Sequence, residues 1–427
     1  MYQPGVGADG HGIVAWGSDS RPTHLWLAPV AYRGAIASFD SIGEVGLMFW
    51  RDLTEHALMT DHRLVNLGDV HQLDDAPNSA PDSTRETRLS ARTAALPVRG
   101  VLSVSEQSIV SAAELADRLG LPGFGVQAAR TLHDRGRTHS VLREVDLPLP
   151  VTLQVDTLSE AIKAAAVLSY PLSVAPAERH LGVARLVRNP AHLTASINAA
   201  MIDAGEGGSV VIQSANPAAT VMLWCMTRDG HTQVIAARRT LHRRSSCGCL
   251  VGHLVDAADH VRTDVAIAQH AAAALETLGV RNGLSRVTME ITTHGPVIVE
   301  VSPGFGEASD VQLVRIATGI DLGRLSIAIA LGSSTGPVTD LDFRCAMQVL
   351  LPGQRRARPM RERLGDIAAM SWAKHVTWIC DRSHRCPHPS ALCPAPIAAA
   401  IVAGWDPAQC LHLAAITQAK FAGTARV

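Results

Sequence analysis

Lysine is nearly absent from this sequence: Lys163, Lys374 and Lys420 are its only lysines, so most of the 38 basic residues are arginine. Chemistry that requires a lysine at a given place has only these positions to draw on. No sign of charge prevails either, because 39 acidic residues leave a formal net charge of −1. Such a balance gives no overall field that would attract nucleic acid or a membrane surface, so we expect neither partner.

Long apolar runs are also missing. No segment reaches the roughly 20 apolar residues that cross a bilayer, and the start MYQPGVGADGHG has no basic region followed by an apolar run, so no signal peptide is expected. Eight cysteines scattered over 427 residues indicate reduced thiols rather than a disulfide framework. These features predict a cytoplasmic enzyme or binding protein with two or three domains.

Hydrophobic periodicity indicates mixed α and β structure. Short apolar runs over residues 12–104 predict βα units around a small parallel sheet. Residues 108–119 have helical spacing, and a second helix is expected over residues 129–145. Strands that alternate apolar and polar residues, with turns at Asp229-Gly230 and His294-Gly295, predict an antiparallel sheet. The tail from about Val338 should add two strands and a final helix.

Several stretches in one order resemble a known family. The longest is GLSRVTMEITTHGPVIVEVSPGFGE followed by LVRIATGIDLGRLSIAIALG. It resembles the metal-binding hairpin and following helix of the ATP-grasp superfamily, in the carboxylate-amine ligase branch that joins amino acids, such as the bacterial dipeptide ligases. VLSVSEQSIVSAAELADRLGLPG, YPLSVAP with LGVARLVRNPAHL, and CLVGHLVDA resemble other parts of the same family. The similarity covers roughly Val101 to Leu331.

The resemblance implies an α/β and α+β protein with the ATP-grasp fold, a Rossmann-like pre-ATP-grasp domain and a C-terminal β-rich lobe. We expect the domains at four ranges: 1–107, the N-terminal α/β domain; 108–205, linker helices and the small lobe; 206–337, the central antiparallel sheet with the metal-binding hairpin; and 338–427, the C-terminal lobe with the final helix.

The resemblance also implies the reaction. Ligases of this kind phosphorylate a carboxylate with ATP, and an amine then displaces the phosphate to form an amide or peptide bond. Phosphoryl transfer depends on positioning and charge neutralisation, which metal ions and basic groups provide. ATP and Mg²⁺, with Mn²⁺ as the alternative ion, are therefore the expected cofactors. The expected substrates are small-molecule carboxylates and amines, amino acids above all, in specialised metabolism; a homodimer is the family-level expectation.

Two glutamates on the arms of the expected hairpin are the candidate metal ligands. A turn at His294-Gly295 would bring Glu290 and Glu300 near each other, and magnesium prefers hard oxygen ligands. Two like charges on one face repel unless a cation lies between them. Ser302 occupies the position of the family's third ligand, an asparagine. The alternative is that these glutamates are solvated strand residues.

The nucleotide side departs further from the family pattern. Arg135 occupies the position of one phosphate-binding lysine and keeps the charge, whereas Ala175 occupies that of the other and keeps none. Gln213, with Ser214 beside it, corresponds to the adenine-side glutamate. Arg179 is a partial substitute for the missing phosphate contact, or else a solvated loop residue. The ribose-binding glutamate corresponds to Ala219.

Arg238 and His253 are the candidate catalytic residues. Arg238 lies on the strand where a further phosphate-contacting lysine is common, and the alternative is an ordinary strand-edge charge. His253 corresponds to a residue that faces the substrate pocket in the family, or is a hydrogen-bonded structural histidine. Asp310 either orients an amine or caps a helix. Gly304 occupies the position of the arginine that holds the substrate carboxylate or acyl phosphate, and supplies no charge.

Three functions remain open at this stage. Glu290, Glu300 and Arg135 favour an active ATP-dependent ligase. The losses at Ala175, Ala219 and other family positions favour a non-catalytic relative that binds a small molecule or a protein partner. A ligase with an unusual phosphate donor or a preactivated acyl group is the third. Separately, three cysteines and two histidines suggest a zinc site or, since their spacing does not follow paired C-x2-C, a loop: Cys380, Cys386, Cys393, His384 and His388.

Overall fold

The architecture is taken from a computed structural model. Near the N-terminus it describes the short strands β1 to β4, and beyond them it describes residues 98–103, 106, 109–182, 184–215, 220–242, 250–306, 308–333, 343–352, 358–379 and 396–423. Among the helices of these ranges, none combines the length and apolar character that crossing a membrane would take.

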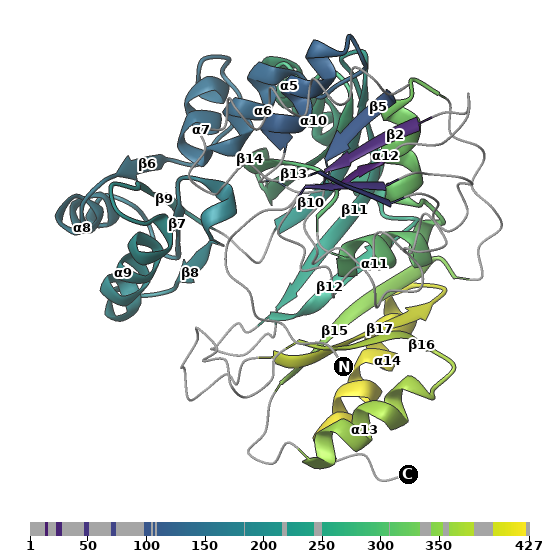
Figure 1. Cartoon of the computed structure of the whole chain (residues 1–427). Helices are drawn as coiled ribbons and strands as arrows, with labels where there is room; N and C mark the ends of the chain where they lie inside the picture. Colours follow the sequence, from purple (N-terminus) through teal and green to yellow (C-terminus); the bar gives the residue numbers. More distant parts are fainter. Residues whose placement is uncertain are drawn as a thin grey trace.

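An antiparallel sheet of eight strands forms the centre of the molecule (Figure 1), in the order β14-β13-β10-β11-β12-β15-β17-β16. Its strands are β10 Thr220–Arg228, β11 His231–His242, β12 Leu250–Asp256, β13 Gly283–Thr292, β14 Gly295–Pro303, β15 Cys345–Pro352, β16 Ala373–Trp378 and β17 Pro396–Gly404.

Alternation along these strands divides the apolar side chains between two cores. On one face, Trp224, Val255 and their neighbours pack with α11 (Ala308–Thr318) and α12 (Leu322–Ala330). On the other, Val287, Ile298 and their neighbours pack with α5 (Ile109–Arg118), α6 (Val126–His133) and α10 (Val265–Thr277). The sheet is therefore covered by helices on both faces.

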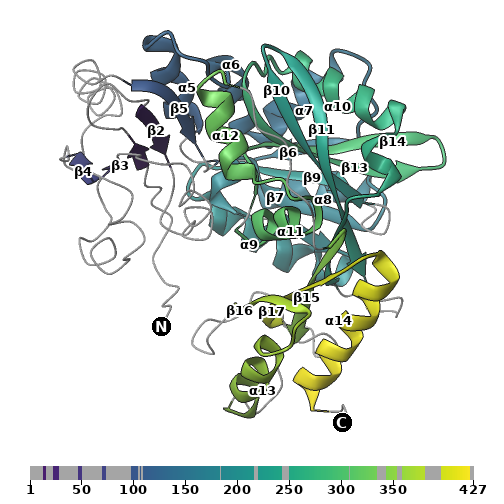
Figure 2. The same cartoon turned by 90° about the vertical axis from the view of Figure 1, so that its right-hand side faces the viewer.

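A smaller antiparallel sheet projects to one side of the central sheet in Figure 1 and lies behind it in the turned view of Figure 2. Its order is β6-β9-β7-β8, and α8 and α9 pack on it through a separate apolar core. At the start of α8 the Thr157 hydroxyl accepts a hydrogen bond from the Glu160 amide, as the T-x-x-E pattern indicates. The elements are β6 Thr152–Val155, α8 Leu158–Ala166, β7 Leu172–Pro176, η3 Arg179–Leu181, β8 Arg185–Val187, η4 Pro190–His192, α9 Leu193–Ala204 and β9 Val210–Ser214.

Two predicted turns occur close to where the sequence indicates. Asp229 and Gly230 join β10 to β11, both with positive φ. The next hairpin turns at Thr293 and His294, and Gly295 begins β14.

The single helix predicted over residues 129–145 is wrong. The chain breaks at Asp134, whose backbone is extended, and α7 (Arg135–Arg143) starts anew. The Asp134 carboxylate caps α7 by accepting a hydrogen bond from the Arg137 amide at 2.7 Å. The break places Arg135 in the first turn of α7, beside the small lobe.

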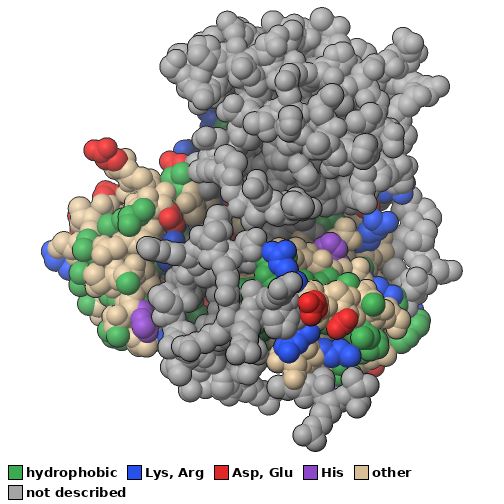
Figure 3. Space-filling model, turned by 60° about the horizontal axis from the view of Figure 1, so that its bottom comes forward, with side chains coloured by type: hydrophobic (Ala, Val, Ile, Leu, Met, Phe, Trp, Pro, Cys, Tyr) green, Lys and Arg blue, Asp and Glu red, His purple; other side chains and the backbone are tan. Residues whose placement is uncertain are grey.

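The C-terminal region contains more secondary-structure elements than predicted. Besides β15 and β17 it contains a third strand, β16, and a helix before it, α13 (Arg358–Ala368). The predicted final helix is confirmed as α14 (Pro407–Ala422), which Asp406 caps. Figure 3 shows acidic and basic side chains interspersed on the visible face of the described residues, as the near-zero net charge suggests.

Much of the predicted N-terminal domain lies outside the described residues. The described strands are β1 Ile13–Ala15, β2 Thr23–Leu27, β3 Leu47–Trp50, β4 Val70–Leu73 and β5 Val98–Ser103. The pairs β2-β5 and β3-β4 are parallel, but they belong to separate sheets, and β1 pairs with β3 antiparallel, so one parallel sheet is not seen among these strands.

Candidate functional site

One face of the β13-β14 hairpin is polar. Thr288 lies opposite Glu300, and Arg286 lies opposite Ser302. Since opposed residues of an antiparallel pair share a face and strand residues alternate, Glu290 lies on this face too. It is a diagonal neighbour of Glu300, because it lies two residues beyond Thr288, which is opposite Glu300. The opposite face of the hairpin is buried in the core.

The loop after β7 brings an arginine onto this polar face. The Arg179 side chain is only 1% exposed, and its Nη1 forms an ion pair with the Glu300 carboxylate. The same Nη1 donates to Ser302 Oγ at 3.2 Å, while Nε donates to the Leu132 carbonyl at 2.7 Å. Arg179 is thus no solvated loop residue. It connects the small lobe to two of the three expected metal ligands.

Arg135 fixes the same loop. Its guanidinium donates to the Pro176 carbonyl at 2.8 Å and to the Gly182 carbonyl at 3.2 Å, and its backbone amide donates to the Ala177 carbonyl at 2.8 Å. Its Nε lies 3.4 Å from Glu300 Oε1. Arg135 therefore stands beside the hairpin as the sequence predicts, but much of its hydrogen bonding holds the main chain.

The charge of Glu300 is stabilised by this arrangement. Burial raises the pKa of Glu300, but the guanidinium groups around it, that of Arg179 first among them, lower the pKa to about 2. The carboxylate is ionised at any ordinary pH, and 34% of the side chain remains exposed. Burial lowers the pKa of Arg179 from its usual value, and Glu300 opposes that shift; an arginine stays charged all the same.

The expected magnesium site does not fit these contacts as they stand. Glu290, Glu300 and Ser302 share a face and offer oxygen donors, which suits a hard cation. However, Arg179 already binds Glu300 and Ser302, so a cation at these two ligands would have to displace the guanidinium. Within the described ranges, no three His, Cys, Asp or Glu side chains gather as metal ligands.

The adenine-side candidates lie where the small lobe meets the hairpin. Gln213 is 8% exposed, and its Oε1 accepts from the Thr152 hydroxyl at 3.3 Å. The same hydroxyl lies 3.3 Å from Nδ1 of His139, whose Nε2 is 3.0 Å from the Val299 carbonyl. A polar chain therefore runs from Gln213 to the residue before Glu300. Ser214 ends β9 and is half-buried.

Burial lowers the pKa of His139 to about 4, so its imidazole is neutral near pH 7. When the neutral ring donates from Nε2 to the Val299 carbonyl, Nδ1 is an acceptor, and the single Thr152 hydroxyl proton is shared between Nδ1 and Gln213 Oε1. Sequence reasoning missed His139 and Thr152. No local pattern marks them, because their partners come from other elements.

The two candidate catalytic residues also lie on this face of the central sheet. Met222 is opposed by Thr288 on one side and by Arg238 on the other, and His253 lies opposite Thr240, two residues after Arg238. Burial, and then the charge of Arg238, lowers the pKa of His253 well below its usual value. His253 is therefore neutral at pH 7, and its lowered pKa makes it a weak proton acceptor.

Arg238 is not a free strand-edge charge. Its Nη1 donates to Asp310 at 2.6 Å, and the Asp310 side chain is only 4% exposed. Asp310 lies in the first turn of α11 instead of capping it. The neighbouring Arg239 faces the other way and binds Asp259 through Nε at 2.6 Å and Nη2 at 2.8 Å.

Arg286 and Glu106 are further members of the site that the sequence did not single out. Arg286 Nη2 forms an ion pair with Glu106, which ties the hairpin to the segment before α5. Gly306 makes room for this packing. Its φ is +91°, and a Cβ there would lie 2.7 Å from Asp310 Oδ2 and 3.3 Å from Arg286 Cδ.

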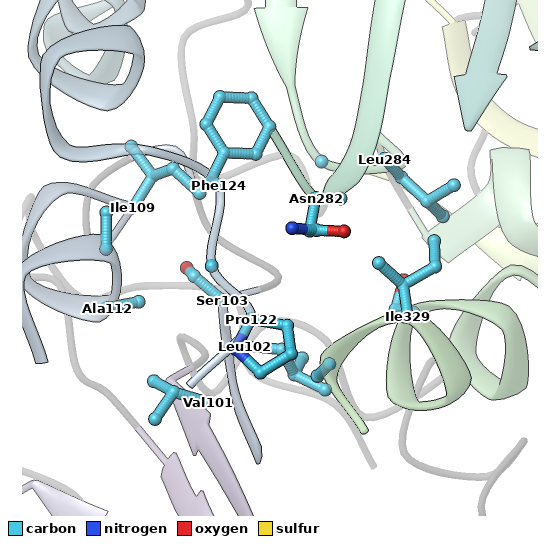
Figure 4. A pocket seen from close by; sticks show the side chains of 16 residues that line it. Val101, Leu102, Ser103, Ile109, Ala112, Pro122, Phe124, Asn282, Leu284 and Ile329 are labelled. Carbon is cyan, nitrogen blue, oxygen red and sulfur yellow. The ribbon is translucent and has the colours of Figure 1, made fainter. Parts of the chain in front are cut away.

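A cavity of about 40 Å³ lies at the far end of β14, between β5, α5 and α12. Figure 4 shows apolar side chains around it, with Ser103 and the Asn282 amide as polar groups, and Gly304 contributes to the wall. A space of this volume holds about two or three water molecules.

Several sequence candidates lie outside the described residues: Ala219 and the proposed zinc residues Cys380, Cys386, Cys393, His384 and His388. Ala175, by contrast, is described, and it is buried in β7 with 3% exposure. No charged group replaces the family's lysine at that position.

Comparison with known proteins gives a structural likeness without a sequence match. No family model matches the chain, and no curated protein does. An L-amino acid ligase from Bacillus licheniformis is 17% identical with a TM-score of 0.71, over 92% of this chain and 95% of that one. An N5-carboxyaminoimidazole ribonucleotide synthetase in complex with ADP is 12% identical with a TM-score of 0.62, over 93% and 96%.

The biotin carboxylase domain of 2-oxoglutarate carboxylase from Hydrogenobacter thermophilus, a domain dimer in complex with MgADP, ADP and bicarbonate, is also similar. It is 12% identical with a TM-score of 0.58, over 88% of this chain and 84% of that one. At these identities the likeness concerns the fold.

Proposed function

The chain has the ATP-grasp fold, and from this premise we propose that it is an ATP-dependent carboxylate-amine ligase. A carboxylate oxygen of one substrate attacks the γ-phosphorus of ATP, and ADP leaves. The amine of the second substrate then attacks the acyl carbon and expels phosphate, which forms the amide bond. Amino acids are the proposed substrates, and specialised metabolism is the proposed setting.

The observation that carries the proposal is the junction between the small lobe and the hairpin. Arg135, Arg179 and Arg286 surround the Glu300 carboxylate there, on the face that also bears Arg238 and the acidic groups. Phosphoryl transfer depends mainly on positioning and on neutralising phosphate charge. Guanidinium groups suit this role because their planar forks hold phosphate oxygens in pairs.

The arginines of the site are held by different elements, which suggests different roles. Arg135 is held by carbonyls of the small-lobe loop and would approach the phosphates from that side. Arg179 is almost fully buried against Glu300 and would position the loop. Arg238, held by Asp310, lies on the central sheet, on the same face as His253. The proton that the amine loses goes to the released phosphate or to solvent. We assign no step to a divalent cation, because Arg179 occupies two of its expected ligands.

The direct test is an ADP-release assay with ATP and pairs of amino acids, with mass spectrometry of the products. We expect ADP release that depends on an amino acid, and a product heavier than either substrate by one new amide. Glu300→Gln should abolish both. Arg130→Gln, which alters an arginine that is 50% exposed and paired with Glu114 on α5, serves as the control. Absence of release with every pair would end the ligase proposal.

A second function is favoured by one observation. Ala175 is buried without a charged replacement for the family's lysine, and the Glu300 charge is already neutralised within the protein. A non-catalytic relative that only binds a nucleotide or another small molecule would need no further charged groups. Nucleotide binding by calorimetry, together with no ADP release, is the outcome that supports this alternative.

A further inference from the structure

Arg179 occupies a place where a cation is expected. Its Nη1 contacts both the Glu300 carboxylate and the Ser302 hydroxyl. These oxygen donors are two residues apart on β14 and share a face. A metal ion at this point would likewise be a single positive group bound to both oxygen donors.

The guanidinium is fixed there from the other side. Nε donates to the Leu132 carbonyl at the end of α6, and the loop that carries Arg179 is fastened to the start of α7 through Arg135. The side chain is almost fully buried. Its position is therefore set by two elements that are remote from the hairpin in sequence, and not by Glu300 alone.

Charge around the carboxylate opposes a second cation. Arg135 lies 3.4 Å from Glu300 Oε1, and Arg286 also acts on Glu300 from the same strand face. A divalent ion at Glu300 would add two positive charges among these guanidinium groups, and like charges at such distances repel. It would also leave Arg179 buried without its carboxylate.

We propose that Arg179 is the resident cation of this site, and that its guanidinium takes the place of a divalent ion at Glu300 and Ser302. The chain on its own then has no accessible divalent-cation site at these ligands. Phosphate groups that bind at the junction meet arginine there instead of metal. This last step rests on the proposed function, whereas the exclusion of the ion does not.

The test is a titration of the full-length chain with Mn²⁺ in the absence of nucleotide, with free Mn²⁺ measured by electron paramagnetic resonance. Arg179→Gln removes the guanidinium and leaves Glu300 ionised. We expect this variant to bind one Mn²⁺ at least about tenfold more tightly than wild type, and Arg179→Gln combined with Glu300→Gln to lose that site. Arg185→Gln is the matched control, since Arg185 is a small-lobe arginine paired with Asp203 instead of the hairpin.

Equal Mn²⁺ affinity of wild type and Arg179→Gln would overturn the proposal, whether both bind the ion or neither does. Survival of the new site in the double variant would overturn it as well. If circular dichroism shows that Arg179→Gln does not fold, the test compares wild type with Glu300→Gln. Mn²⁺ binding by wild type that Glu300→Gln removes would refute the proposal. Absence of such binding would support it. ADP binding in EDTA is measured separately; its failure would count against the proposed function and leave the Mn²⁺ result standing.

Discussion

The contact between the small lobe and the hairpin should appear as a coupling energy between Arg179 and Glu300. Two unit charges about 4 Å apart interact by about 4 kcal/mol at an effective dielectric constant of 20. Because 34% of the Glu300 side chain is exposed, solvent screening reduces this, and we expect a coupling of about 2 kcal/mol. Glu300→Gln alone should cost about 3 kcal/mol locally, since it leaves Arg179 buried without a carboxylate.

The assay is a double-mutant cycle read by hydrogen exchange. A chain with several separate hydrophobic cores need not unfold in one step, so the local opening free energy is the appropriate quantity. It is measured on peptides that cover residues 177–182 and 297–303, for wild type, Arg179→Gln, Glu300→Gln and the double variant. Single effects that add to the double effect within about 0.5 kcal/mol would refute the reasoning. Arg185→Gln should leave the hairpin peptide unchanged.

Two further predictions concern residues that support the site. Burial lowers the pKa of His139 to about 4 in the folded chain, whereas an unfolded chain protonates its histidines near pH 6.5. The free energy of unfolding should therefore fall as the pH drops from 6.5 to 4, by at most about 3 kcal/mol. Thermal melting at several pH values should show a smaller slope for His139→Gln, and an unchanged slope would contradict the assignment. Gly306→Ala should destabilise by about 2 kcal/mol, because the new Cβ meets Asp310 at a positive φ. Gly295 also has a positive φ, but a Cβ there would meet open space. Gly295→Ala should therefore lower the stability less than Gly306→Ala in the same melts, and equal destabilisation would rule out the contact between the new Cβ and Asp310.

The hairpin could be predicted from sequence because its information is local. Alternation over GLSRVTMEIT and GPVIVEVSP determines which side chains face the core, and the residues near His294 indicate the turn. The register was not predictable in detail. The irregularity after Thr288 shifts the pairing by one residue, so Glu290 lies opposite Val297 although Thr288 lies opposite Glu300.

Other parts of the site depend on contacts between distant segments. Arg179 and Glu300 are 121 residues apart, and nothing in the loop sequence AERHLGV distinguishes a buried ion pair from a solvated arginine. The helix break at Asp134 had a usable signal, since Asp is a good N-cap residue. Apolar residues at helical spacing on both sides of Asp134 nevertheless favoured one continuous helix.

The central claim is that nucleotide binds where the small lobe meets the hairpin, and calorimetric titration with ATP and magnesium tests it most directly. Wild type and Arg130→Gln should each bind one nucleotide per chain. Arg135→Ala should bind roughly tenfold to a hundredfold more weakly, as expected for the loss of a charged hydrogen bond. Absence of binding by wild type, or equal affinity of Arg135→Ala, would contradict the claim.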